Sequence, residues 1–256
     1  MSAVRVERLG RIARVTLNRP EVKNAFNDAL VLELEEAFKT LAGEAHVVVL
    51  AGEGDAFCAG ADLNWMKKSV EYTTEDNERD AAKMVGLFKS IDEFPGAVVG
   101  RIHGATLGGG LGLLSCCDVS VAVPDIKLAF SEVRLGLVPA IISPFVMNKI
   151  SAADARVLFM TGQGFSSQKA QSMGLITEVV EPQELDATVE KYVRRFLVAG
   201  PKAMVEAKAL VREVTLRERE DALRFAVSKI AELRSSEEGQ EGLAAFLEKR
   251  KPSWIP

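Results

Sequence analysis

Short apolar runs and longer amphipathic segments alternate along the first half of the chain. Residues 4–9 and 12–18 are β-branched runs separated by a glycine, which predicts a hairpin of two strands. From Asn27 to Leu41 apolar residues recur at helical spacing, and Asn27 is the predicted N-cap. The uninterrupted apolar run at 47–50 is typical of a strand that is buried on both faces of a parallel sheet.

The later segments continue this alternation. The predicted elements are a glycine- and alanine-rich loop at 52–62, a helix at 73–92, a strand at 97–102, a glycine-rich bend at 104–110, an apolar helix at 111–117 and a strand at 119–123. Strand–helix–strand crossovers of this kind imply parallel strands joined by right-handed turns.

Beyond Ser143 the pattern becomes mostly helical. Helices are predicted at 151–161, 167–174, 184–199, 202–216, 218–234 and 237–249. The pair Gly200-Pro201 is a natural break between helices. We therefore predict an α/β core over residues 1–199 and a helical carboxy-terminal oligomerisation region over residues 200–256.

Composition narrows the class of protein. The chain has 256 residues, 48% of them hydrophobic and 27% charged, which predicts a compact globular protein and excludes disordered, collagen-like and coiled-coil chains. A net charge of −4 argues against nucleic acid or an anionic membrane as the main partner. No apolar stretch is long enough for a membrane helix, and the first residues do not resemble a signal peptide.

The cysteines point to a reducing compartment. There are three of them, Cys58, Cys116 and Cys117, and a chain of this length does not need disulfides to fold. We therefore expect a cytoplasmic protein. No cysteine or histidine spacing predicts a metal site.

The triplet Gly108-Gly109-Gly110 lies between a predicted strand and a predicted helix. Free backbone N–H groups at a helix amino terminus can bind a small anionic or polarised oxygen. The alternative is that the glycines only let the strand and the helix pack closely. A phosphate loop is excluded because no Gly-Lys-Ser/Thr follows, and the dinucleotide fingerprint is absent. A carbonyl-sized ligand remains the best candidate.

A second small-residue loop and one acidic residue complete the candidate chemistry. The loop at 57–63 follows the apolar strand at 47–50, at the end of the sheet where α/β proteins bind ligands, although it could be an ordinary turn. Glu132 interrupts an apolar stretch, so its carboxylate must be hydrogen-bonded, paired or used for proton transfer. Arg134 is the obvious partner, because residues two apart on a strand share a face.

Five segments of the chain carry the motifs of one family, in order and at compatible spacing. They are Asn18-Arg19-Pro20 with Asn24-Ala25; Phe57 to Leu63; His103-Gly104 with the glycine triplet and Cys117-Asp118; Glu132 with Gly136 and Pro139; and Phe246 to Pro252. Together they resemble the crotonase, or enoyl-CoA hydratase/isomerase, superfamily over nearly the whole chain. The resemblance implies an α/β fold, a crotonase-like spiral of ββα turns with a helical carboxy-terminal trimerisation region, and a homotrimer or homohexamer.

The resemblance also implies a mechanism. The thioester oxygen of an acyl-CoA substrate would lie between the backbone N–H groups of Ala61 and Gly109, an oxyanion hole, and Glu132 would act as acid and base. Two such donors can each lower the barrier to an enolate by roughly 3–4 kcal/mol. No metal or redox cofactor is implied, because CoA is part of the substrate.

The remaining site residues also come from the resemblance. CoA would lie along the backbone of Ala59, Gly60, Ala61, Asp62 and Leu63, with Lys23 and Asn24 approaching its nucleotide. The acyl side would involve Gly108, Gly112 and Pro139. Phe246 and Lys249 match a CoA contact that relatives take from the neighbouring subunit.

The chain departs from the family pattern at one position. Typical hydratases carry a second glutamate where this chain has Gly112. One carboxylate must then serve as both base and acid, or another group must substitute. If the missing carboxylate selects branched acyl chains, Gly112→Glu should shift the preference toward crotonyl-CoA.

Three functions remain open. The first is an enoyl-CoA hydratase or the reverse dehydratase, acting on 3-methylglutaconyl-CoA or 3-hydroxy-3-methylglutaryl-CoA in leucine catabolism, because the segments at 108–113 and 132–144 resemble that bacterial branch. The second is a double-bond isomerase, for which one carboxylate suffices. The third is a family member that binds acyl-CoA or a partner without turnover.

Overall fold

Two β-sheets, a large mixed one and a small parallel one, form the main body of the protein together with the helices that cover them. The computed structural model describes residues 2–255. The large sheet has the order β1 (Val4–Leu9), β2 (Ile12–Leu17), β3 (Val47–Gly52), β5 (Ala97–Ile102), β7 (Val119–Ala122), β9 (Glu178–Val179). The predicted hairpin is confirmed, since β1 and β2 are antiparallel, and every later strand pairs in parallel.

The small sheet contains β4 (Ala56–Cys58), β6 (Ala105–Leu107) and β8 (Leu128–Ala129), all parallel. The chain gives a strand to the large sheet, then a strand to the small sheet, and then one or more helices, and it repeats this order three times. This is the expected spiral of ββα turns, so the predicted fold class is confirmed. The sequence predicted loops in place of β4 and β6, because strands of two or three residues are too short to show an alternating pattern.

The helices follow the predicted pattern closely. They are α1 (Asp28–Leu41), α2 (Leu63–Ser69), α3 (Thr74–Asp92), α4 (Gly109–Cys116), α5 (Ser143–Met147), α6 (Ala152–Thr161), α7 (Ser167–Ser172), α8 (Leu185–Leu197), α9 (Pro201–Thr215), α10 (Arg219–Ser235) and α11 (Glu237–Leu247). Asn27 is the N-cap of α1, as predicted, because its side chain accepts a hydrogen bond from the Leu30 N–H at 2.9 Å. Short 3₁₀ turns lie at Pro20–Val22, Glu132–Leu135 and Pro182–Glu184.

The large sheet is buried on both faces. Val48 and Leu50 of β3 pack into the core beneath α1, α3 and α4, while Val47 and Val49 pack with residues of α8. Successive side chains of a strand point to opposite faces, so an uninterrupted apolar run serves both cores at once. The interpretation of residues 47–50 as a doubly buried strand is confirmed.

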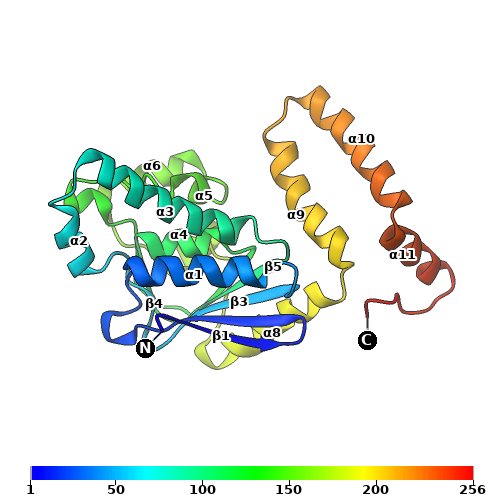
Figure 1. Ribbon diagram of the computed structural model, residues 1–256, viewed down its shortest axis with the longest axis horizontal. Coiled ribbons are helices and arrows are strands. Elements are labelled where there is room, and N and C mark those ends of the chain that lie inside the picture. The colour runs from blue at the N-terminus through cyan, green and yellow to red at the C-terminus, as the bar shows by residue number, and fades with distance from the viewer. Residues whose placement is uncertain (1, 256) are drawn as a thin grey trace.

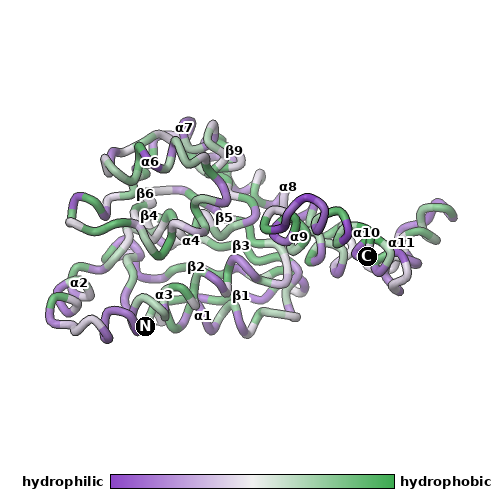
Figure 2. The backbone as a smooth tube through the Cα atoms, turned by 90° about the horizontal axis from the view of Figure 1, so that it is seen from above, coloured by the Kyte–Doolittle hydropathy of each residue, from purple (hydrophilic) through white to green (hydrophobic). Residues whose placement is uncertain are grey.

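The helices α9, α10 and α11 form an arm that extends beside the body (Figure 1) and away from it (Figure 2). Ion pairs from Lys208 to Asp118 at 3.0 Å and from Arg212 to Glu93 at 2.9 Å attach α9 to the body. Within the described chain, neither α9 nor α10 contributes a buried residue. The predicted division at residue 200 falls between α8 and α9.

The three cysteines are free, buried thiols. Burial raises the pKa of Cys58 and of Cys117 to about 12, which keeps both thiols protonated at neutral pH. Across residues 2–255, no cluster of histidine, cysteine and acidic side chains is arranged to hold a metal ion. A search of the same residues for a helix with the length and apolarity to cross a bilayer finds none.

Candidate active site

Three predicted site residues lie just beyond the carboxyl ends of the three small-sheet strands. Ala61 follows β4, Gly109 follows β6 and Glu132 follows β8. Because β6 pairs in parallel with both neighbours, these ends meet at one edge of the sheet. The small sheet therefore brings together groups that are far apart in the sequence.

The loop that contains Ala61 is paired to the segment around Phe26. The Phe26 N–H donates to the Gly60 carbonyl at 2.7 Å, and the Asp62 N–H donates to the Phe26 carbonyl at 2.9 Å. In an extended segment alternate peptide groups point to opposite sides, so the Ala61 N–H points away from Phe26. No acceptor within residues 2–255 takes this N–H, and Ala61 is exposed.

The second loop starts helix α4. Gly108 has φ +48° and ψ −118°, a conformation that only glycine adopts readily. The Gly108 N–H donates to the Ala129 carbonyl at 3.0 Å, and the Leu111 N–H donates to the Gly108 carbonyl at 2.9 Å. In the part of the chain that the structure describes, the N–H of Gly109, the first residue of α4, has no acceptor. It lies at the positive end of the helix, as an oxyanion donor should.

The glycines of α4 are also required by close packing. A Cβ on Gly109 would lie 2.8 Å from Phe26 Cε2, and a Cβ on Gly110 would meet the Cys58 carbonyl. The close-packing interpretation of the glycine triplet is therefore confirmed, while oxygen binding by its free N–H stays a prediction.

Glu132 lies beside this second loop. Its Oε1 atom is 3.2 Å from the position of a Cβ on Gly108. Its Oε2 atom is buried and has no hydrogen-bond partner among the described residues. Burial raises the pKa of Glu132, against a smaller opposing effect of its own backbone N–H. The carboxyl group is therefore suited to exchanging a proton with a bound molecule.

Of the alternatives left open for Glu132, the ion pair with Arg134 is wrong. The two residues lie on a 3₁₀ turn and not on a strand, so side chains two apart point in different directions. Arg134 is exposed, and its Nε atom lies 3.3 Å from the position of a Cβ on Gly162. Neither Glu132 nor Arg134 forms an ion pair within residues 2–255.

The position of the missing second glutamate is filled. Gly112 is buried, and a Cβ on it would meet Ile142 Cγ2 and would lie 2.8 Å from Phe88 Cε1. A glutamate side chain at this position has no room unless Ile142 and Phe88 move, and the shift of preference toward crotonyl-CoA stays a prediction. Gly112 and Pro139 are both buried in the packed interior, so neither is exposed to a ligand.

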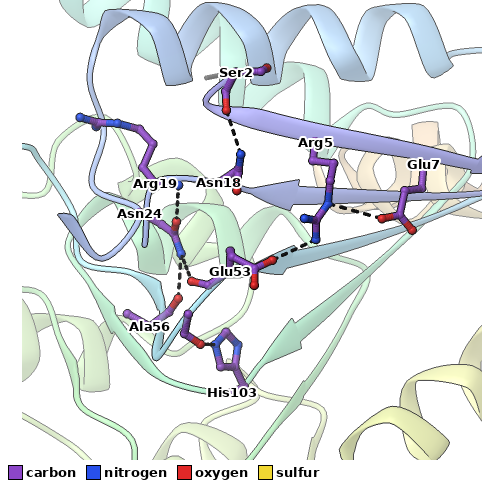
Figure 3. A network of polar contacts seen from close by, with 10 residues as sticks. Ser2, Arg5, Glu7, Asn18, Arg19, Asn24, Glu53, Ala56 and His103 are labelled. Carbon is purple, nitrogen blue, oxygen red and sulfur yellow. Dashed lines mark hydrogen bonds and ion pairs between the residues drawn. The ribbon is translucent and has the colours of Figure 1, made fainter. Parts of the chain in front are cut away.

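Asn24 stabilises the segment that leads into the first loop through hydrogen bonds of its side chain. It is fully buried with φ +56°. Its Nδ2 donates to the carbonyls of Glu53 and Ala56 at 2.9 Å each, and its Oδ1 accepts the Arg19 N–H at 2.9 Å, as Figure 3 shows. The predicted contact between this side chain and a nucleotide is thus corrected, since all its polar atoms are used internally. The neighbouring Lys23 is exposed.

Asp62 is held by an arginine that sequence reasoning did not single out. Arg19 Nη2 lies 2.8 Å from Asp62 Oδ2, and the two side chains are 16% and 6% exposed. Asp62 Oδ1 accepts the Asn64 N–H at 2.8 Å and so caps α2. Burial alone would raise the pKa of Asp62, but the hydrogen bonds from Arg19 and Asn64 outweigh it and lower the pKa. Its backbone groups are also used internally, since the N–H donates to the Phe26 carbonyl and the carbonyl accepts the Met66 N–H, both at 2.9 Å.

Exposed apolar side chains lie on the segments that follow Glu132 and Ala61 in the sequence. The segment after Glu132 exposes Leu135, Leu137 and Val138, and the first loop exposes Leu63, which is 74% exposed. A cavity of about 310 Å³ adjoins Asp62 at the start of α2.

Phe246 and Lys249 do not reach the site of their own chain. Both are exposed at the end of α11, and Phe246 is 81% exposed. Figure 1 shows α11 on the side of the molecule opposite α2, the helix that begins beside Ala61.

Comparison with known proteins identifies the family of the chain. The sequence profile named "Enoyl-CoA hydratase/isomerase" matches residues 7–255. The chain belongs to the enoyl-CoA hydratase/isomerase family. The predicted superfamily is thereby confirmed, and so, at the level of the family, is a hydratase-type enzyme.

Individual relatives cover almost the whole chain. The crystal structure of an enoyl-CoA hydratase from Shewanella pealeana superposes with a TM-score of 0.95 at 33% identity and covers 98% of this chain and 96% of that one. AtuE of Pseudomonas aeruginosa gives a TM-score of 0.95 at 31% identity, covering 99% and 100%. A short-chain-enoyl-CoA hydratase of Clostridium acetobutylicum is 28% identical over 255 residues, 98% of this chain and 97% of its own length.

Proposed function

We propose that this chain is an enoyl-CoA hydratase, or the reverse dehydratase, with Glu132 as its single acid and base and the N–H groups of Ala61 and Gly109 as its oxyanion hole. One observation carries the proposal. The half-buried Glu132 carboxyl group lies beside Gly108, its Oε2 has no hydrogen-bond partner among the described residues, and the N–H groups of Ala61 and Gly109 have no acceptor there. Structural carboxylates are normally paired, and this one is available to a ligand.

The proposed reaction balances with one carboxylate. Glu132 takes a proton from water as the water oxygen bonds to carbon three of the acyl chain. The electrons of the double bond move onto the thioester oxygen between the two amides. Glu132, now neutral, returns its proton to carbon two, and the enolate electrons form the new C–H bond. The raised pKa of Glu132 favours this exchange, and substrate, water and Glu132 account for every proton without a cofactor.

The substrate we propose is 3-methylglutaconyl-CoA, with 3-hydroxy-3-methylglutaryl-CoA as its hydrated form, in leucine degradation. The packed wall at Gly112 supports this choice, because carbon three of a tertiary alcohol carries more of the developing charge and reduces the need for a second acid. The carboxylate of this substrate has candidate partners. Lys127 and Arg134 line a cavity of about 400 Å³, and neither forms an ion pair within residues 2–255.

We propose that CoA lies along the backbone of residues 59–63 and that a partner subunit completes the site. Lys23 would approach the nucleotide, and the hydrogen bond from the Ala59 N–H to its carbonyl at 2.9 Å supports this by joining it to the proposed CoA segment. Phe246 and Lys249 of a neighbouring subunit would cover the CoA, and the oligomer that we propose for this is a homotrimer or homohexamer. The exposed apolar side chains of the arm support such an assembly. Three free thiols suit the cytoplasm.

A double-bond isomerase is the second candidate. The observation that favours it is the absence of room for a second acid at Gly112, because moving a proton between carbons two and four needs only Glu132. A binder without turnover has less support, since an unpartnered carboxyl group beside two free amides has no use in binding alone.

Offering three thioesters separates these functions. Crotonyl-CoA, 3-methylglutaconyl-CoA and 3-butenoyl-CoA are given in water enriched in oxygen-18, and the absorbance of the conjugated thioester is followed. A hydratase lowers that absorbance and adds one labelled oxygen. An isomerase raises it with 3-butenoyl-CoA and adds none. Binding of all three without either change would overturn the proposal.

A further inference from the structure

Phe26 connects the two loops that carry the amide donors. Its backbone pairs with Gly60 and Asp62, on either side of Ala61. Its ring lies against Gly109, where Cε2 is 2.8 Å and Cδ2 is 3.2 Å from the position of a Cβ. One residue therefore contacts both loops, through the main chain on one side and the ring on the other.

The Phe26 ring is fixed by its surroundings. The residue is 1% exposed, and its ring meets that of Phe88 edge-on, with centroids 6.2 Å apart and planes at 72°. Phe88 in turn packs against Gly112 on the same helix, α4. Close-packed interiors transmit displacement, so a change in the size of this ring must move α4, the first loop or both.

We propose that Phe26 is a positioning residue that sets the separation of the Ala61 and Gly109 N–H groups. It does not touch the substrate. The inference rests on the proposed function, since it assumes that these two amides bind the enolate oxygen. A pair of donors stabilises the enolate only at one spacing, and a shift of about 1 Å can cost about 100-fold in rate.

The test substitutes Phe26→Leu, which keeps both backbone hydrogen bonds and removes the ring. Phe38→Leu is the matched control. Phe38 is also 1% exposed and also has one edge-on partner, Phe94 at 5.6 Å, but it lies inside α1 and contacts neither loop. Both variants should lose thermal stability to a similar degree.

The readout is the ionisation of bound acetoacetyl-CoA, whose enolate has its own ultraviolet absorbance. Ionisation needs the two donors but no turnover. We expect Phe26→Leu to lower the ionisation constant of the bound thioester roughly ten-fold, within the range expected for misplaced groups, and Phe38→Leu to leave it unchanged. Equal ionisation in Phe26→Leu and the unsubstituted protein would overturn the inference. If the unsubstituted protein neither binds nor ionises this thioester, the proposed function fails instead.

A second pair of variants keeps the inference testable if Phe26→Leu does not fold. Gly109→Ala places a methyl group against the Phe26 ring and should lower the ionisation constant. Adding Phe26→Met, which keeps most of the volume on a flexible side chain, should recover part of that loss. A double variant no better than Gly109→Ala alone would show that the ring does not set the spacing.

Discussion

The two sides of the candidate site are built in opposite ways. The amides of Ala61 and Gly109 belong to segments that are tightly held, by backbone pairing to Phe26 and by ring packing. Glu132, on the other side, has a buried oxygen with no partner within residues 2–255. The difference follows from the chemistry: a donor must stay in one place, while a proton carrier must change its charge and so cannot be fixed by a permanent ion pair.

We expect substitution of Glu132 to have the largest effect on the rate. Glu132→Gln keeps the shape of the side chain and removes its exchangeable proton. We expect kcat to fall by about 100- to 10,000-fold, the usual contribution of general acid–base catalysis, with little change in the affinity for acyl-CoA. Steady-state kinetics with the best thioester substrate measures kcat, and calorimetric titration measures affinity. Turnover near that of the unsubstituted protein would remove Glu132 from the chemistry.

We expect kcat to be less sensitive to a single substitution near the amides of Ala61 and Gly109. Arg19→Met breaks the ion pair with Asp62 and lets the loop around Ala61 relax. We expect kcat to fall roughly 10- to 100-fold, less than the about 100- to 1,000-fold cost of deleting a donor outright. Arg101→Met, which breaks an Arg–Asp pair to Asp186 outside the site, is the control and should leave kcat unchanged. Equal losses of kcat in both variants would mean that Arg19 acts only through overall stability.

The close packing of Ile142 and Phe88 against Gly112 predicts an effect on stability. Alanine in place of a helical glycine gains about 1 kcal/mol from helix propensity, whereas overpacking against Ile142 and Phe88 costs about 1–3 kcal/mol, so Gly112→Ala should lower Tm by a few degrees. Ile142→Leu, which removes the contacting Cγ2, should restore part of the loss.

A matched glycine in another helix tests the reasoning about Gly112. A Cβ on Gly86 of α3 would meet only the flexible carboxylate end of Glu35. Gly86→Ala should therefore keep the gain from helix propensity and raise Tm. Scanning calorimetry of the two variants side by side decides the point, and a rise in Tm for both would contradict the packed wall.

The sequence predicted the groups at this site but not what holds them. Ala61, Gly109 and Glu132 were found because they lie in motifs with an order and a spacing. Arg19 and Asp62 lie in two separate motifs, and nothing in the sequence shows that they pair. The strands β4, β6 and β8 have two or three residues each, too few for a period to be detected. The predicted pair of Glu132 with Arg134 failed because it assumed a strand where the chain forms a 3₁₀ turn.

The smallest expected effect is the pH dependence that Glu132 gives to the stability of the folded protein. Burial raises the pKa of Glu132 above its ordinary value of 4.5, so the folded protein holds this proton to higher pH than the unfolded chain does. The contribution of Glu132 to the free energy of unfolding is therefore fully present below pH 4.5. It declines as the pH rises through the raised pKa. Glu132→Gln carries no charge at any pH and escapes this decline.

The Tm of Glu132→Gln should thus exceed that of the unsubstituted protein at pH 8 by more than it does at pH 4. A difference of about 2–4 °C corresponds to about 1 kcal/mol in a chain of this size. Comparing the two pH values removes the constant cost of burying an amide, and Glu71→Gln, at an exposed position, should show no such dependence. A gap that stays constant with pH would mean that folding does not raise the pKa of Glu132. The contrast between a fixed amide side and an unpartnered acid would then no longer hold.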